Sequence, residues 1–168
     1  MNAKIYPSSI QGEISVPSSK SHTIRALIIA TLAGGRSYIR NPLLSDDCKA
    51  AMRIAGQFGS TVTAEDGVWI VDGPVDGLKT PDDIVNVDNS GTTLYFMTSV
   101  AALLRDYTVF TGDKSIRKRP VQPLLTALNQ LGAQSSTTRE GNACAPFFIK
   151  GPIRGGEVNV PCTTSQYI

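Results

Sequence analysis

Hydrophobic residues in this chain follow two different periods in turn. Short segments with an apolar residue at every second position each run into a small polar loop, and that loop opens a segment with helical spacing. Three such junctions occur, with central valines at Val16, Val87 and Val160. These valines lie about 70 residues apart, so the pattern predicts an internal repeat of that length.

The first repeat unit is predicted over about residues 13–82. Its opening strand is expected at Glu13–Val16, and helical spacing follows from Ile24 to Leu32. Gly34-Gly35 ends this helix because glycine adopts positive φ without strain. The remainder is predicted as a strand, a helix and a strand over Tyr38–Asn41, Ser45–Phe58 and Val68–Val71.

The second unit, over about residues 83–155, repeats this order. Units of this kind pack their helices inward and their strands outside, and they expose the loops at one end. The predicted fold class is therefore α+β, built of repeated βαβαββ-type units. The predicted elements are strands at Ile84–Val87, Tyr107–Phe110 and Phe147–Lys150 and helices at Leu94–Leu104 and Val121–Leu131.

Only the beginning of a third unit, over residues 156–168, is present in the sequence. A strand at Glu157–Val160 and a loop lead to Gln166, where we expect a helix to begin. Residues 1–168 are therefore expected to form a single domain that is part of a longer enzyme. A compact domain of two units is the alternative, because a chain of this length can bury a core by itself.

The composition indicates an ordinary soluble globular chain, with 41% hydrophobic and 18% charged residues. No apolar run approaches the length of a membrane span, and the N-terminus lacks the pattern of a signal peptide. A cytoplasmic location is therefore expected. Three cysteines without close spacing indicate neither a disulfide framework nor a zinc site: Cys48, Cys144 and Cys162.

The net charge of +2 is too small to indicate nucleic-acid binding through a general positive field. The basic residues are unevenly distributed, however, and four of the sixteen lie between Lys114 and Arg119. A loop at a helix start also offers free backbone N–H groups where the helix dipole favours negative charge. These features together predict a small anionic ligand.

The first loop brings three polar side chains to one helix start. If Ser21 begins the helix, Arg25 lies one turn further on the same face, so that Lys20, Ser21 and Arg25 can converge on one anion. A serine N-cap beside two solvated bases would explain the same pattern. His22 has no carboxylate partner nearby in the sequence and is expected to be a surface or structural residue.

The second loop, Asn89–Thr93, places Gly91 where backbone can approach a phosphate or carboxylate. Helix capping alone would also explain it, and it is neither a Walker loop nor a dinucleotide-binding motif. In the basic loop, Pro120 is expected at the first helical position, which would place Arg119 at the start of that helix. A bound anion would offset the unfavourable position of a cation there. Thr163–Gln166 adds neutral donors, and a capping run is again the alternative.

In this order, the motifs resemble those of the enolpyruvyl transferases, and among them the 5-enolpyruvylshikimate-3-phosphate synthases. Residues 19–27 resemble the family pattern S-K-S-x-x-x-R-A-L, Asn89–Thr92 resembles N-[AS]-G-T, and Arg119-Pro120 resembles the R-P pair after a basic stretch. The resemblance extends over essentially all 168 residues.

The resemblance implies transfer of the enolpyruvyl group of phosphoenolpyruvate to the 5-hydroxyl of shikimate 3-phosphate, with release of phosphate and without a metal or organic cofactor. It implies that shikimate 3-phosphate is held by Lys20, Ser21, Arg25, Thr164, Ser165 and Gln166. It implies that phosphoenolpyruvate is held by Lys20, Asn89, Gly91 and Arg119, and that Gln166 also lies near it. Lys20 and Arg119 are the residues to which it assigns a catalytic role. No nucleic-acid or membrane partner is expected.

The family also places acid and base residues in a second domain that has no counterpart here, so this chain alone is expected to turn over poorly. In the family, residues 1–12 can belong to that other domain. Two departures from the pattern are Tyr95-Phe96, where the family commonly has an Arg-Pro or Arg-Leu pair, and Ser18 or Ser19 in place of the usual glycine before S-K-S. The alternatives are a UDP-N-acetylglucosamine enolpyruvyl transferase, which should read K-N at Lys20-Ser21 and carry a loop cysteine, and a non-enzymatic phosphate-binding repeat module.

Overall fold

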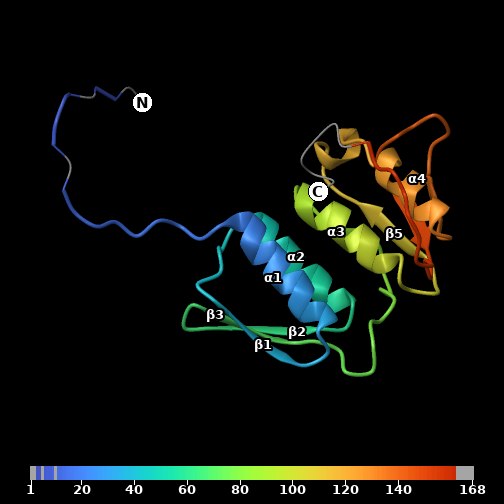
Figure 1. Ribbon diagram of the computed structural model, residues 1–168, viewed down its shortest axis with the longest axis horizontal. Coiled ribbons are helices and arrows are strands. Elements are labelled where there is room, and N and C mark those ends of the chain that lie inside the picture. The colour runs from blue at the N-terminus through green and yellow to red at the C-terminus, as the bar shows by residue number, and fades with distance from the viewer. Residues whose placement is uncertain (1–2, 5, 10, 162–168) are drawn as a thin grey trace.

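The helices α1, α2 and α3 lie between two small sheets in the computed structural model, which describes residues 3–4, 6–9 and 11–161 (Figure 1). The first part of the chain forms α1 (Lys20–Leu32), β1 (Arg36–Arg40), α2 (Asp46–Gln57), β2 (Thr61–Glu65) and β3 (Val68–Asp72). The second part forms β4 (Val85–Asn86), α3 (Gly91–Ala101), β5 (Thr108–Thr111), the 3-10 helix η1 (Ile116–Lys118), α4 (Gln122–Gln130), β6 (Gln134–Thr137) and β7 (Phe147–Lys150).

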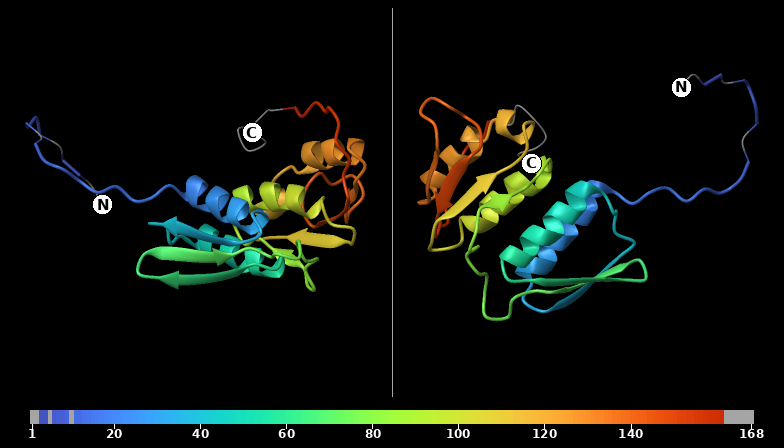
Figure 2. Two further views of the ribbon diagram at one scale, coloured as in Figure 1. Left: turned by 60° about the horizontal axis from the view of Figure 1, so that its bottom comes forward. Right: turned by 180° about the vertical axis from the view of Figure 1, so that it is seen from behind.

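The first sheet has the strand order β1-β3-β2, with both pairs antiparallel. β3 is its central strand, and its alternate residues Trp69 and Val71 are buried because they face the helices. α1 contacts β1 and β3, and α2 contacts β2, so the two helices lie side by side against one face of this sheet (Figures 1 and 2).

The second sheet has the order β4-β5-β7-β6, in which β4 pairs parallel to β5 and the other pairs are antiparallel. Phe110 of β5 stacks on Phe147 of β7 with 5.3 Å between ring centroids, and both are fully buried. α3 contacts β5, β7 and α1. One continuous core therefore joins the two halves of the chain.

Close packing at the carboxyl end of α1 depends on Gly73. A Cβ atom at this position would lie 2.6 Å from the carbonyl oxygen of Ala30, which real Cβ atoms do not tolerate. β3 can therefore end directly against α1 only because a glycine follows it.

The predicted α+β class is confirmed, and the four helices predicted before residue 132 are present with their ends shifted by a few residues. The helix expected to begin at Gln166 lies outside the described residues. The strands predicted at Glu13–Val16 and Glu157–Val160 are wrong, since neither segment pairs with another strand. Ile14 is 88% exposed and Val16 is 73% exposed, so the alternating pattern has no surface to pack against. A strand needs a neighbour for its backbone groups, and no described residue supplies one there.

The sequence analysis did not identify β2 and β6. Both strands are polar and face solvent over much of their length, so they lack the apolar alternation on which the predictions depended. Their pairing with the more apolar β3 and β7 holds them in place.

Candidate functional site

Three of the helices begin with a serine cap. The side-chain oxygens of Ser19, Ser45 and Ser90 accept hydrogen bonds from the backbone N–H three residues further on in α1, α2 and α3. The expectation that Ser21 begins α1 is wrong, because Ser19 is the cap and Lys20 is the first helical residue. Ser21 therefore lies within the first turn, where it is half-buried.

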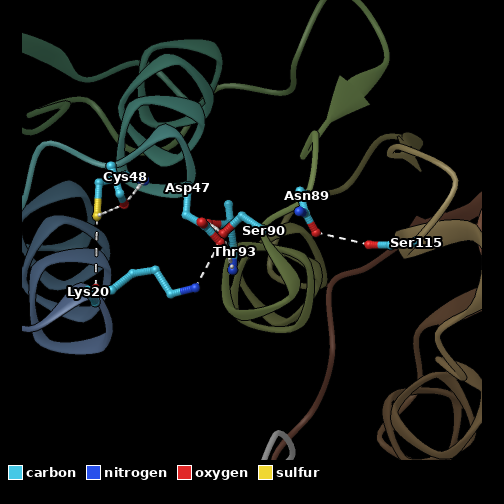
Figure 3. Close-up of polar contacts among 8 residues, drawn as sticks. Lys20, Asp47, Cys48, Asn89, Ser90, Thr93 and Ser115 are labelled. Carbon is cyan, nitrogen blue, oxygen red and sulfur yellow. Dashed lines mark hydrogen bonds and ion pairs between the residues drawn. The ribbon is translucent and has the colours of Figure 1, made fainter. Parts of the chain in front are cut away.

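The starts of α1 and α2 are in contact through Lys20. Its Nζ lies 3.2 Å from Oδ1 of Asp47, and the Sγ of Cys48 lies 4.0 Å from the Lys20 carbonyl oxygen (Figure 3). The Lys20 side chain is 47% exposed, and an exposed ion pair of this kind is worth at most about 1 kcal/mol. An incoming anion can therefore compete with Asp47 for this ammonium group.

Arg25 lies between α1 and α3. Its guanidinium carbon is 4.9 Å from the centre of the Phe96 ring, and its Nη1 donates to the Ser21 carbonyl oxygen at 3.4 Å. A guanidinium over an aromatic face is held by the negative face of the ring without losing its charge. Phe96 therefore places this cation beside α3 while leaving it available to an anion.

Arg119 lies against the first residue of α3. A Cβ at Gly91 would come within 2.6 Å of the Arg119 Nη1, so only glycine lets the guanidinium rest there. No carboxylate in residues 11–161 lies within 4 Å of this guanidinium. The start of α3 therefore combines N-terminal backbone N–H groups with a half-buried cation that has no carboxylate partner in that range.

The expected position of Arg119 relative to the next helix is wrong. Arg119 follows the short helix η1, and α4 begins only at Gln122, with Val121 as its cap and Pro123 in its first turn. Pro120 instead forms a bridge with Cys144 and so cannot open the helix. The helix dipole that acts on the Arg119 side chain is therefore that of α3.

The basic loop is tied to the second loop and is internally capped. Oγ of Ser115 donates to Oδ1 of Asn89 at 2.9 Å, and Oδ1 of Asp113 accepts from the backbone N–H groups of Ile116 at 2.9 Å and Ser115 at 2.8 Å (Figure 3 shows the first of these contacts). These hydrogen bonds, that from Ile116 first, lower the pKa of the Asp113 carboxyl below its usual range. The first part of the loop that carries Arg119 is thus anchored to the second loop.

The structure therefore brings the predicted residues together in two groups. Lys20, Ser21 and Arg25 lie at the start of α1, and Asn89, Gly91 and Arg119 lie at the start of α3. Arg25 of the first group contacts Phe96, which belongs to α3, the helix that begins at the second group. The remaining predicted residues lie outside the described part of the chain: Thr164, Ser165 and Gln166.

Sequence analysis missed two residues at this site. Asp47 was interpreted only as a carboxylate in the first turn of α2, and nothing in its position along the chain indicated that Lys20 would be its partner. Tyr95 was noted only as a departure from a family pattern, whereas its hydroxyl donates to the Pro120 carbonyl at 3.0 Å.

Two hollows lie near these elements without containing Lys20, Arg25 or Arg119. One of about 310 Å³ lies beside the start of α1, where Ser19, His22 and Arg40 line it. The other, of about 760 Å³, lies at the carboxyl end of α2 and is lined by Gln57, Ser60, Lys79 and three aspartates.

Two further findings apply to the described residues alone. Within residues 3–4, 6–9 and 11–161, no three His, Cys, Asp or Glu side chains are grouped so that they could hold a metal ion. None of the helices in the same residues is both long and apolar enough to cross a bilayer.

Comparison with known proteins gives a consistent result. The family model described as EPSP synthase (3-phosphoshikimate 1-carboxyvinyltransferase) matches residues 5–168. The chain is 45% identical over 168 residues to a 3-phosphoshikimate 1-carboxyvinyltransferase of Acetivibrio thermocellus and 47% identical over 168 residues to one of Ruminiclostridium cellulolyticum. Each comparison covers all of this chain and 40% of the relative.

The fold gives the same result as the sequence. The structure of EPSP synthase from Acinetobacter baumannii superimposes with a TM-score of 0.84 at 27% sequence identity, over 93% of this chain and 36% of that one. The chain thus spans about 40% of the length of the curated relatives it matches. Because the family match covers nearly every residue, the chain belongs to the EPSP synthase family.

Proposed function

We propose that this chain supplies substrate-binding residues to an enzyme that transfers the enolpyruvyl group of phosphoenolpyruvate to the 5-hydroxyl of shikimate 3-phosphate and releases phosphate. The observation that carries the proposal is the position of Arg119, whose guanidinium lies on Gly91 at the start of α3 with no carboxylate of residues 11–161 within 4 Å. A cation at a helix start is repelled by the positive end of the helix dipole. The arrangement becomes favourable once an anion binds between the cation and the helix start.

Phosphoenolpyruvate is the proposed ligand of this second group. Arg119 would bind its phosphate or carboxylate through the paired donors of the guanidinium, and the backbone at Gly91 would approach the same group. Asn89, held by Ser115, would add a side-chain amide donor. Lys20 completes the proposed set, and Gln166 is proposed to lie near the same ligand.

Shikimate 3-phosphate is the proposed ligand of the first group. Lys20 would exchange Asp47 for the phosphate, and Ser21 and Arg25 would contribute a hydroxyl and a guanidinium from the same helix. Thr164, Ser165 and Gln166 are proposed for the phosphate and the ring hydroxyls from their motif alone.

In the proposed reaction, the 5-hydroxyl loses its proton as its oxygen adds to C2 of phosphoenolpyruvate, and C3 gains a proton. The tetrahedral adduct then loses phosphate from C2 and a proton from C3, which forms the enolpyruvyl double bond. Two anionic substrates must come within reacting distance, and their mutual repulsion opposes this. Lys20, Arg25 and Arg119 would neutralise that repulsion and orient both substrates. Lys20 and Arg119 are proposed as the catalytic residues because they would touch the phosphoenolpyruvate.

The repeat organisation is part of the same proposal. Units over about 13–82 and 83–155, with a third beginning at 156–168, would present their helix starts on one side, and a second domain would close over them. The element order from β4 to β7 supports a βαβαββ unit. A cytoplasmic location also stays a prediction.

Calorimetric titration of the chain with shikimate 3-phosphate, phosphoenolpyruvate and inorganic phosphate at one ionic strength tests the proposal. We expect shikimate 3-phosphate to bind more tightly than inorganic phosphate, and phosphoenolpyruvate affinity to depend on Arg119. Equal weak binding of all three would instead indicate a general phosphate-binding module. The chain alone is expected to show little turnover, and a rate within tenfold of a full-length relative would contradict that expectation.

A further inference from the structure

Tyr95 is a buried tyrosine of α3 that contacts the segment carrying Arg119. Only 5% of its surface is exposed, and its hydroxyl donates to the carbonyl oxygen of Pro120, the residue directly after Arg119, at 3.0 Å. We infer that Tyr95 is a positioning residue, whose hydroxyl fixes the Arg119 backbone so that the guanidinium stays over the start of α3. This inference rests on the proposed role of Arg119 in binding phosphoenolpyruvate.

One face of α3 contacts the Arg119 segment at two points. Gly91 and Tyr95 are four residues apart, so they lie on the same side of the helix, one turn from each other. The end of the Arg119 side chain lies against Gly91. The Tyr95 hydroxyl binds the backbone of Pro120, the residue after Arg119. The tip of the Arg119 side chain therefore contacts α3 at Gly91, and the backbone next to Arg119 contacts α3 at Tyr95.

Other backbone contacts hold the segment to different parts of the chain. The Arg119 N–H donates to the Ile116 carbonyl at 3.0 Å, and the Val121 N–H donates to the Ala143 carbonyl at 2.7 Å. These bonds hold the segment to η1 and to residues near Cys144, whereas the hydrogen bond from Tyr95 holds it to α3. Since proline has no N–H, the carbonyl is the backbone group of Pro120 that can hydrogen-bond.

Such a bond matters because arginine has many rotamers and loses them when it binds an anion. A fixed backbone and a fixed resting place reduce the conformations that must be lost on binding. A purely structural role for Tyr95 would depend on its ring, which belongs to the core. Removal of the hydroxyl alone therefore separates the two roles.

The test compares Tyr95→Phe with Tyr107→Phe in the whole chain. Tyr107 is an exposed tyrosine that contacts Phe148 and Lys150 on the second sheet, so its variant controls for loss of a phenolic hydroxyl. The arginine Nε–Hε signals are recorded by NMR without ligand, with Arg119 assigned from Arg119→Lys, and phosphoenolpyruvate is then titrated.

We expect Tyr95→Phe to shift and broaden the Arg119 signal and to weaken phosphoenolpyruvate binding by about two- to tenfold, the effect of one neutral hydrogen bond. Tyr107→Phe should change neither. In an Arg119→Ala background, Tyr95→Phe should have no further effect on affinity, because it acts through the absent side chain.

An unchanged Arg119 signal in Tyr95→Phe would overturn the inference, and so would a full additional loss of affinity in the Arg119→Ala background. An unfolded Tyr95→Phe protein would also overturn it, since a residue that only orients Arg119 is not required for folding. If the normal chain binds no phosphoenolpyruvate but the signal still responds to Tyr95→Phe, the proposed function fails while the positioning role stands.

Discussion

The starts of α1 and α3 are built alike and differ in how they hold their cation. Both helices begin after a serine cap, and each has a basic side chain at its first turn. At α1 the cation is Lys20, which is paired with Asp47 of the neighbouring helix. At α3 the cation is Arg119, which comes from a later segment and has no carboxylate of residues 11–161 within 4 Å.

This difference predicts different binding behaviour at the two helix starts. A ligand at Lys20 exchanges one ion pair for another, so the net gain in free energy is small. A ligand at Arg119 forms a new pair with a cation that is already fixed in place, so the gain is larger. The second start should therefore contribute more of the binding energy for an anion than the first.

Removal of the Arg119 side chain should have the largest effect. We expect Arg119→Ala to weaken phosphoenolpyruvate binding by about 10- to 100-fold, the value of one or two hydrogen bonds to a charged group. Arg105→Ala removes an exposed arginine just after α3 and is the matched control. Calorimetric titration with phosphoenolpyruvate measures the affinity of both variants. If Arg119→Ala bound as tightly as Arg105→Ala, the two helix starts would not differ in how strongly they bind an anion.

Substitution of Gly91 should displace the guanidinium without removing it. A Cβ there would lie 2.6 Å from the Arg119 Nη1, which is the end of a flexible side chain and can move away. We therefore expect Gly91→Ala to weaken phosphoenolpyruvate binding by about three- to tenfold with little change in stability.

The control for that variant is Gly56→Ala in α2. A Cβ at Gly56 meets no atom within 4 Å, so the substitution should raise the free energy of unfolding by about 0.5–1 kcal/mol and leave binding unchanged. Urea denaturation and titration together separate the two effects. A Gly91→Ala protein with normal affinity would show that the close contact at Arg119 is not needed for binding.

Release of Lys20 from Asp47 should have a smaller effect of the opposite sign. We expect Asp47→Asn to tighten shikimate 3-phosphate binding by up to about fivefold, because the competing exposed ion pair is worth at most about 1 kcal/mol. Asp46→Asn is the control, because Asp46 lies in the same turn but pairs with Lys49 and not with Lys20. It should leave shikimate 3-phosphate binding unchanged. Weaker binding by Asp47→Asn would mean that Asp47 orients Lys20 and does not compete with the ligand.

The acid dependence of stability should show the smallest effect. Hydrogen bonds from the backbone of Ile116 and from Ser115 lower the pKa of Asp113, and the hydrogen bond and charge of Arg36 lower that of Asp72. A carboxyl whose pKa is lowered by folding stabilises the protein above its ordinary value of 3.8 and loses that contribution as the pH falls through the folded value.

Asp113→Asn should therefore make stability less dependent on pH below about 4, as measured by urea denaturation across a pH series. Both carboxyl groups are exposed, so the change is expected to be modest. An unchanged pH profile would show that the cap of the Arg119 loop does not depend on the charge of Asp113.

The helices were predictable because each carries its own local signal. Helical spacing with glycine at the end placed α1 and α2, and the same periodicity placed α3 and α4 within a few residues. The ordered motifs at Lys20, Gly91 and Arg119 also identified the family, since their order along the chain needs no knowledge of the fold.

Contacts between distant residues were decided only by the tertiary structure. The sequence could not show that Arg119 rests on α3 instead of opening α4, or that Asp47 pairs with Lys20, because these partners are far apart along the chain. The segment Glu13–Val16 alternates like a strand and yet is not one, since strand pairing requires a neighbour that its own residues cannot specify. Local periodicity thus determined the helices, and the packing of separate segments decided where each charge lies.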